Sequence, residues 1–167
     1  ICCGMYCNRS VLPDRSQNLR PRIQQSAPDP RPAVTADCVV FCNDSDGLSV
    51  LLIERANKPF KGCWAFPGGF MEMDEDAEDC AKRELKEETG MEVRSLEYLG
   101  TFSEVNRDPR GRTITIAYYA VVEKSVVIGA DDASQARWFP IDSIPPLAFD
   151  HDKILRMALE EIKKGMI

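Results

Sequence analysis

An acidic segment, residues 69–91, holds the side chains whose types and spacing could do chemistry. Between residues 72 and 88 it carries nine carboxylates and three basic groups, an excess that equals the chain's whole net charge of −6. Glu84, Glu87 and Glu88 fall at i, i+3 and i+4, so a helix would place them on one face. Such like-charged neighbours destabilise a helix by roughly 0.2–0.5 kcal/mol per pair, whereas a hard divalent cation needs several converging carboxylate oxygens. The spacing therefore indicates either a divalent-cation site or a solvated acidic helix face.

A helix is expected to present these carboxylates, and the sequence marks both of its ends. Asp74 or Asp76 can act as the N-cap before an acidic first turn, which suits the positive end of the helix dipole. Gly90 supplies a left-handed stop after the last turn. A narrow apolar stripe would dock the helix on the core, and it consists of Ala77, Ala81 and Leu85.

Two glycines precede the helix in what reads as a tight turn, Pro67-Gly68-Gly69. Because glycine has no Cβ, its backbone can approach a bound ion or phosphate closely. The carbonyl of Gly68 or Gly69 can therefore face the carboxylates. A plain strand-to-helix turn is the other interpretation, and the two are compatible.

The same residues match the Nudix box, which reads Gly, five residues, Glu, seven residues, then Arg-Glu-apolar-any-Glu-Glu-any-Gly-apolar. The matching positions are Gly69, Glu75, Arg83, Glu84, Leu85, Glu87, Glu88, Gly90 and Met91. Nine such positions agree by chance on the order of once in 10⁹ starting points, so the chain resembles the Nudix hydrolase family. The resemblance implies an α/β fold, a Nudix-type α/β/α sandwich with a mixed β-sheet.

The resemblance also implies a metal site. In this family Mg²⁺ ions sit between the acidic helix and the phosphates of a nucleoside diphosphate that is linked to another group. By position, Glu84 and Glu88 are the foremost metal ligands, followed by Glu87 and by the carbonyl of Gly69. Mn²⁺ is a second candidate for the ion.

Three residues form the catalytic group that the resemblance implies, namely Glu84, Arg83 and Glu75. Arg83 is expected to orient the carboxylates through a salt bridge to Glu75, and an ordinary surface arginine is the alternative. Family members use either the first glutamate of this cluster, Glu84, or an acid in a later loop as general base. The late-loop candidate here is Asp131 or Asp132, and an ordinary loop also accounts for that pair.

Stretches outside the box, residues 60–62, 107–112 and 147–151, resemble a subgroup of ADP-ribose pyrophosphatases and ADP-ribose-sensing regulators. Arginines in a loop suit phosphate recognition, and a solvated turn is the alternative. His151 is expected to have a structural role at a helix start. One position departs from the subgroup, because ADP-ribose hydrolases often carry a proline where this chain has Val105. The expected substrate-binding residues are Phe60, Arg107, Arg110 and Arg112.

The implied function is a Mg²⁺-dependent hydrolase that cleaves ADP-ribose to AMP and ribose 5-phosphate. A pyrophosphatase for an oxidised nucleotide such as 8-oxo-dGTP is the second candidate. A non-catalytic ADP-ribose sensor is the third, and the complete box favours an enzyme. The expected partner is a small nucleotide, and a homodimer is left open.

The composition argues against three classes of protein, namely nucleic-acid binders, membrane proteins and disulfide-rich proteins. A pI near 4.9 argues against a general nucleic-acid binder. The sequence contains no run of 18 apolar residues, so no membrane-spanning helix is expected. Seven cysteines give no even disulfide framework and predict reduced thiols. The expectation is a cytoplasmic protein without nucleic-acid or membrane partners.

Proline-rich and apolar stretches divide the chain into an irregular N-terminal arm, residues 1–32, and a Nudix domain, residues 33–167. Alternation and apolar runs predict strands at 34–42, 48–53, 64–66, 93–105, 112–122 and 137–139. An amphipathic helix is expected at 150–164.

Overall fold

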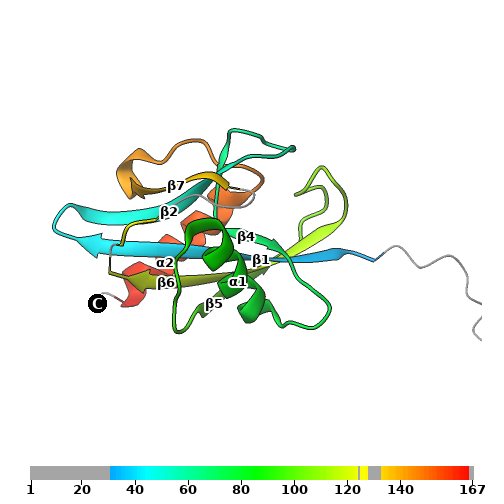
Figure 1. Cartoon of the computed structure of the whole chain (residues 1–167), viewed down its shortest axis with the longest axis horizontal. Coiled ribbons are helices and arrows are strands. Elements are labelled where there is room, and N and C mark those ends of the chain that lie inside the picture. Colours follow the sequence, from blue (N-terminus) through cyan, green and yellow to red (C-terminus); the bar gives the residue numbers. More distant parts are fainter. Residues whose placement is uncertain (1–30, 124, 128–132, 166–167) are drawn as a thin grey trace, which may run out of the picture. The chain divides into compact units, whose positions relative to one another are not determined.

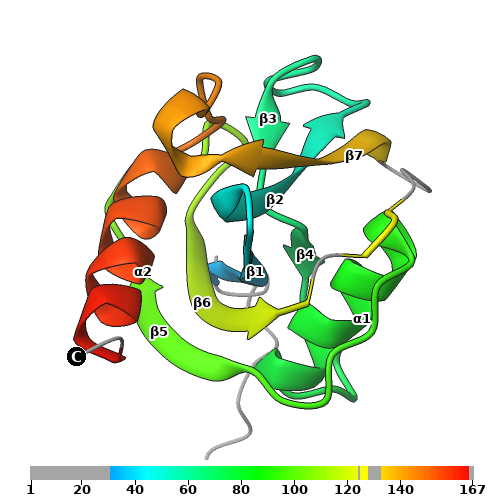
Figure 2. The ribbon, with the colours of Figure 1, turned by 90° about the vertical axis from the view of Figure 1, so that its left-hand side faces the viewer.

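The computed structural model describes residues 31–123, 125–127 and 133–165. Within them a seven-stranded mixed sheet lies between two helices (Figures 1 and 2). The predicted α/β/α sandwich with a mixed sheet is therefore confirmed. The predicted irregular arm, residues 1–32, falls almost wholly outside the described residues, and the boundary at residue 33 stays a prediction.

The central strand is β1 (Ala33–Asp44), which has partners along both of its edges. On one edge it pairs in parallel with β6 (Thr113–Val122). On the other edge β4 (Gly68–Phe70) pairs antiparallel with its first half and β2 (Gly47–Arg55) with its last residues. A strand paired on both edges and covered on both faces reads as a continuous apolar run, as residues 38–42 do.

The remaining strands extend the sheet outward. β5 (Glu97–Phe102) pairs antiparallel with β6, and both β3 (Trp64–Ala65) and β7 (Ala133–Pro140) pair antiparallel with β2. A 3₁₀ turn, Ile141–Ser143, follows β7.

Three predictions of local structure differ from the structure in kind or by more than two residues at an end. The Gly68-Gly69 stretch, expected as a tight turn, begins the short strand β4, because pairing with β1 holds its backbone extended. The strand expected at 93–105 is limited to β5, and the one expected at 137–139 is longer because β7 follows β2 along its length. Register with a neighbour decides these bounds, and local propensity does not.

Alternate residues of the strands supply two separate cores. The core beneath α1 (Ala77–Thr89) takes its side chains from β1 and β2 at Ala36, Cys38, Val40, Leu51 and Ile53. The core beneath α2 (His151–Gly165) takes the intervening residues Val39, Phe41, Val50 and Leu52, together with Ile154, Leu155, Ala158 and Ile162 of the helix. The two helices therefore cover opposite faces of the sheet (Figure 2).

Helix α1 begins and ends where the sequence predicts. Asp76 is the N-cap, and its side chain accepts from the backbone N–H groups of Glu78 and Asp79 at 3.1 and 3.0 Å. Gly90 adopts a left-handed φ of 72° and donates to the carbonyl of Lys86. The capping residues Asp76 and Gly90 thus determine the two ends of the helix that carries the acidic side chains.

The described residues contain four free thiols, Cys38, Cys42, Cys63 and Cys80. Cys38, Cys42 and Cys80 are buried and Cys63 is partly buried, and the reduced state stays a prediction. In the described part of the chain, neither helix is long and apolar enough to cross a bilayer.

Candidate active site

One turn of α1 presents its glutamates to a cavity of about 270 Å³ between the helix, the sheet and the loops at the N-terminal end of β6. Glu84 and Glu88 line this cavity, and Glu88 is only 5% exposed. Glu87 lies at the surface and pairs with Arg83 at 3.0 Å. The predicted acidic face is therefore split into a buried carboxylate (Glu88), a partly buried one (Glu84) and an exposed one (Glu87).

Arg83 holds the acidic cluster together. Its guanidinium donates to Glu75 at 2.9 and 2.6 Å, to Glu84 at 2.8 Å, to Glu87 at 3.0 Å and to the carbonyl of Phe70 at 3.2 Å. The predicted salt bridge between Arg83 and Glu75 is present. Hydrogen bonds from Arg83 lower the pKa of Glu75 to about 2, so this carboxylate stays charged and anchors the arginine.

The two glycines of β4 let the sheet approach these carboxylates. The backbone N–H of Gly68 donates to Glu88 Oε2 at 3.0 Å. A Cβ on Gly69 would lie 2.3 Å from Glu84 Oε1, and one on Gly68 would lie 2.4 Å from Asp37 Oδ1. Glycine is required at both positions because a larger residue would fill the space that the carboxylates occupy.

The two cavity carboxylates have different partners: Glu84 pairs with Arg83 at 2.8 Å, whereas Glu88 accepts from the backbone N–H of Gly68. Burial and the neighbouring charges of Glu84 and Asp37 raise the pKa of Glu88 to about 8, and burial likewise raises the pKa of Glu84. In the described residues no three His, Cys, Asp or Glu side chains already converge as a metal cluster. Even so, the donor set fits a hard divalent cation, since it offers carboxylate oxygens beside a glycine backbone with no side chain.

The raised pKa of Glu88 predicts a pH dependence of stability for the metal-free protein. The folded state binds the proton more tightly than the unfolded chain, where a glutamate titrates near 4.5. The stabilising contribution is full below pH 4.5 and is lost as the pH rises through about 8. With a chelator present, we expect the free energy of unfolding to fall by a few kcal/mol at most between pH 5 and pH 9.

Urea titrations at a series of pH values measure this effect. Glu88→Gln should flatten the profile, and Glu84 should retain a smaller dependence of the same sign because burial raises its pKa too. Arg55 acts on Glu88 in the opposite direction through its positive charge. A profile in Glu88→Gln as steep as that of the unmodified protein would contradict the assignment.

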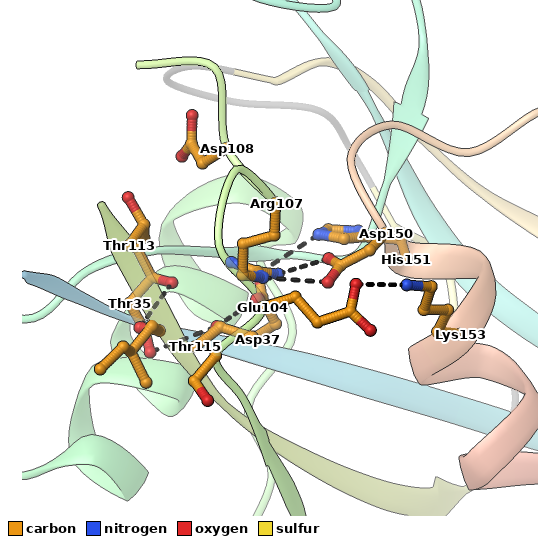
Figure 3. A network of polar contacts seen from close by, with 12 residues as sticks. Thr35, Asp37, Glu104, Arg107, Asp108, Thr113, Thr115, Asp150, His151 and Lys153 are labelled. Carbon is orange, nitrogen blue, oxygen red and sulfur yellow. Dashed lines mark hydrogen bonds and ion pairs between the residues drawn. The ribbon is translucent and has the colours of Figure 1, made fainter. Parts of the chain in front are cut away.

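Asp37 and His151 line the cavity, and Thr115 contacts Asp37 from β6 (Figure 3). The sequence did not point to Asp37 or Thr115 as site residues. Thr115 Oγ1 on β6 donates to Asp37 Oδ2 on β1, and His151 Nε2 at the start of α2 lies 3.9 Å from Asp37 Oδ1. The available signal was the lone charge of Asp37 inside the apolar run 34–42, because a charge is seldom buried without a role or a partner.

Two ion pairs fasten the loop between β5 and β6 to the first turn of α2 and to the residue before it (Figure 3). Arg107 donates to both oxygens of Asp150 at 3.0 and 2.6 Å, and this pair is almost fully buried. Lys153 pairs with Glu104 at 2.6 Å on the surface. The predicted substrate residue Arg107 thus lines the cavity, and its hydrogen bonds go to Asp150.

Arg110 lies in the cavity wall between charged and aromatic neighbours. It pairs with the buried carboxylate of Asp108 at 2.7 Å. Its guanidinium carbon also lies 4.9 Å from the ring centre of Phe70 and 5.4 Å from that of Phe149. Both rings line the same cavity.

The other predicted substrate residues lie apart from the cavity lining. Phe60 packs edge-on against Phe149, with ring centres 4.8 Å apart. Arg112 donates to the carbonyls of Ser103 and Glu104. The late-loop candidates, Asp131 and Asp132, fall outside the described residues.

Comparisons with known proteins agree with this geometry. The family model described as NUDIX domain matches residues 31–158. An ADP-ribose pyrophosphatase of Methanocaldococcus jannaschii is 43% identical over 125 residues, which are 75% of this chain and 72% of that protein.

Solved structures give the same family. The NUDIX domain of Shewanella oneidensis NrtR, crystallised with ADP ribose, is 34% identical with a TM-score of 0.76, over 80% of this chain and 90% of that one. NrtR has also been solved with a 27mer DNA, at 31% identity and a TM-score of 0.65, over 78% of this chain and 62% of that one.

A third structure adds a metal. The bifunctional NMN adenylyltransferase/ADP ribose pyrophosphatase of Francisella tularensis, complexed with AMP and a Mn ion, is 31% identical with a TM-score of 0.73. The match covers 81% of this chain but only 43% of that protein. The complete box, the paired glycines and carboxylates, and these matches together show that the chain belongs to the NUDIX family.

Proposed function

We propose that this chain is a pyrophosphohydrolase that cleaves ADP-ribose to AMP and ribose 5-phosphate. The observation that carries the proposal is the pairing of Glu84 and Glu88 with Gly68 and Gly69 at one cavity. The 43% identity to an ADP-ribose pyrophosphatase supports the substrate.

A divalent cation, Mg²⁺ or Mn²⁺, is part of the proposal. Glu84 and Glu88 would hold it, with Glu87 and the carbonyl of Gly69 as further oxygen ligands. When bound, such an ion neutralises diphosphate charge and lowers the pKa of a water ligand. The neighbour complexed with a Mn ion supports this choice of cofactor.

The chain's own side chains position the reaction. Arg83 engages Oε1 of Glu84 and is itself fixed by Glu75, so the glutamate keeps one orientation. Burial raises the pKa of Glu84, which makes its carboxylate a stronger base than an exposed one. Glu84 would take the proton of the attacking water as the bond between a bridging oxygen and phosphorus breaks, and Asp131 or Asp132 is the alternative base.

Arg110 is the substrate-binding residue for which the cavity gives the best support. Its positive charge at the wall would attract the diphosphate, and the rings of Phe70 and Phe149 hold its guanidinium. We expect Arg110→Ala to raise KM for ADP-ribose about tenfold, with a smaller change in kcat. Steady-state kinetics measure both constants.

An arginine far from the cavity provides the control for this experiment. Arg156 pairs with Asp152 on the exposed face of α2, and Arg156→Ala should leave KM unchanged. An equal rise of KM in both variants would show a general charge effect and remove Arg110 from the site.

A product assay tests the proposed function. The protein is incubated with Mg²⁺ and ADP-ribose, NADH, diadenosine polyphosphates, sugar nucleotides or 8-oxo-dGTP, and the products are separated by chromatography. ADP-ribose should give the highest kcat/KM, and a chelator should stop the reaction. A higher value for 8-oxo-dGTP would favour the oxidised-nucleotide pyrophosphatase instead.

A sensor is the candidate of another class, and the NrtR likeness favours it. Binding of ADP-ribose without cleavage would identify this role. The intact carboxylate pair at the cavity supports the enzyme over the sensor. NrtR has been solved with DNA, and for this chain the absence of nucleic-acid binding stays a prediction that a gel-shift assay checks.

A further inference from the structure

His151 lines the cavity and is held in one orientation. It is the first residue of α2 and is 3% exposed. Its Nδ1 accepts a hydrogen bond from the backbone N–H of Phe66 at 3.1 Å. The imidazole also stacks on the ring of Phe66, with ring centres 5.0 Å apart and planes 10° apart, and contacts Phe149 at 5.5 Å.

This hydrogen bond determines where the imidazole carries its proton. Because Nδ1 accepts from Phe66, it has a free lone pair and no hydrogen. A neutral imidazole then carries its single hydrogen on Nε2. Burial lowers the pKa of His151, which favours the same neutral form. His151 therefore directs an N–H donor from its far side.

The carboxylate of Asp37 faces this donor but is too distant for a direct hydrogen bond. Nε2 lies 3.9 Å from Asp37 Oδ1, beyond the range of a hydrogen bond. The other carboxylate oxygen, Oδ2, is engaged by Thr115 Oγ1, so the carboxylate cannot rotate freely toward the histidine. Asp37 and His151 both line the cavity. A donor and an acceptor thus stand side by side, with a gap between them.

The gap suits one oxygen that both accepts and donates. Two hydrogen bonds of about 2.8 Å that meet at a single oxygen can span it. A phosphate oxygen fits poorly, since it has no hydrogen to donate and Asp37 would repel its charge. A hydroxyl group meets both requirements.

We propose that Asp37 and His151 form a hydroxyl-binding subsite for a sugar of the substrate. One ribose hydroxyl accepts from His151 Nε2–H and donates to Asp37 Oδ1. The subsite rests on the proposed function, because ADP-ribose carries hydroxyls on both of its riboses. His151 is then a substrate-binding residue in addition to its packing role in α2.

Two substitutions separate binding from packing. His151→Asn places an amide oxygen near Nδ1, so it can still accept from Phe66, but it removes the Nε2 donor. His151→Gln can place an N–H donor near Nε2 but loses the acceptor for Phe66. A purely structural histidine predicts that asparagine is tolerated and glutamine is harmful. The subsite predicts the opposite order for ligand affinity.

Calorimetric titration with the non-hydrolysable α,β-methylene analogue of ADP-ribose measures that affinity without turnover. His151→Asn should weaken binding about tenfold, the loss expected for one neutral hydrogen bond, with a melting temperature above that of His151→Gln because the hydrogen bond from Phe66 is kept. His151→Gln should retain most of the affinity and melt at a lower temperature. Wild-type affinity in His151→Asn would overturn the subsite.

Two further analogues identify which ribose of the ligand binds to Asp37 and His151. One replaces the distal ribose by a methyl group, and the other carries 2′,3′-dideoxyadenosine. The penalty of His151→Asn should disappear with the analogue that lacks the recognised hydroxyl. A penalty that persists with both would show that the gap holds only water and would overturn the subsite.

The outcomes also separate this inference from the proposed function. If the analogue binds but ADP-ribose is not cleaved, the proposed enzyme is contradicted and the subsite stands or falls by the titration. If ADP-ribose is cleaved and His151→Asn binds like the unmodified protein, only the subsite is contradicted. Absence of any binding to the unmodified protein overturns both.

Discussion

Glu88→Gln is expected to abolish turnover and to leave the fold intact. The side chain keeps its size, and its amide oxygen can still accept from the backbone N–H of Gly68, as Glu88 Oε2 does at 3.0 Å. What disappears is a buried negative charge beside Glu84 that would help to bind the cation. We expect kcat to fall at least about a thousandfold, measured in saturating Mg²⁺.

The control for this substitution is another glutamate of the same helix. Glu78 lies in the first turn, pairs with Lys82 at 2.7 Å and is well exposed, so Glu78→Gln should turn over at nearly the normal rate. Urea titration verifies that both variants are folded. A normal rate for Glu88→Gln would remove Glu88 from the mechanism.

Alanine at the two glycines of β4 should damage the protein in two different ways. A Cβ on Gly68 would lie 2.5 Å from the carbonyl oxygen of Ala36 and 2.9 Å from the Cα of Asp37. These are backbone atoms of the central strand and cannot move aside without separating β4 from β1. Gly68→Ala should therefore lower the free energy of unfolding by about 3 kcal/mol.

At Gly69 the obstruction is a side chain instead. A Cβ there would lie 2.3 to 2.8 Å from the carboxylate atoms of Glu84, and that carboxylate can swing away. We expect Gly69→Ala to keep most of its stability while kcat falls about a hundredfold, as a misplaced catalytic group predicts.

Urea unfolding and steady-state kinetics on the same samples compare the two variants. Gly165→Ala is the matched control, since a Cβ at that position meets nothing within 4 Å, and it should change neither quantity. A Gly69→Ala variant with full activity would show that Glu84 need not stay where the structure places it.

The sequence predicted the acidic helix α1, but it did not predict the cavity residues that come from the sheet, such as Asp37. The box residues and the ends of α1 follow from contacts between near neighbours in the chain, such as the cap at Asp76 and the stop at Gly90. Comparisons with known proteins bear out the family, and the ADP-ribose pyrophosphatase relative supports the predicted hydrolase. The roles of the individual side chains remain predictions.

The three arginines of the loop between β5 and β6 show most clearly what the sequence could not predict. A loop with several arginines predicted substrate contacts for Arg107, Arg110 and Arg112 alike. In the structure Arg107 is bound by Asp150, which lies 43 residues away in the chain. Arg110 stays in the cavity wall, and Arg112 donates to carbonyls of its own loop. The residue type correctly suggested a role in binding anions, but the group that each guanidinium binds depends on residues that the neighbouring sequence does not reveal.

By itself the sequence determined the helix that carries Glu84 and Glu88, its two ends, and the family, whereas the salt bridge from Arg83 to Glu75 was implied by the resemblance to that family. The helix and its ends depend on residues within one or two helical turns, so their spacing specifies the geometry. Only the tertiary structure decided that Thr115 and His151 lie beside Asp37, and that Asp37 and His151 line the cavity. Asp37 and Thr115 lie 78 residues apart, and the parallel register of β1 with β6 brings them together. Register follows from which face of each strand is buried, and for two strands so far apart in the chain no short stretch of sequence records it.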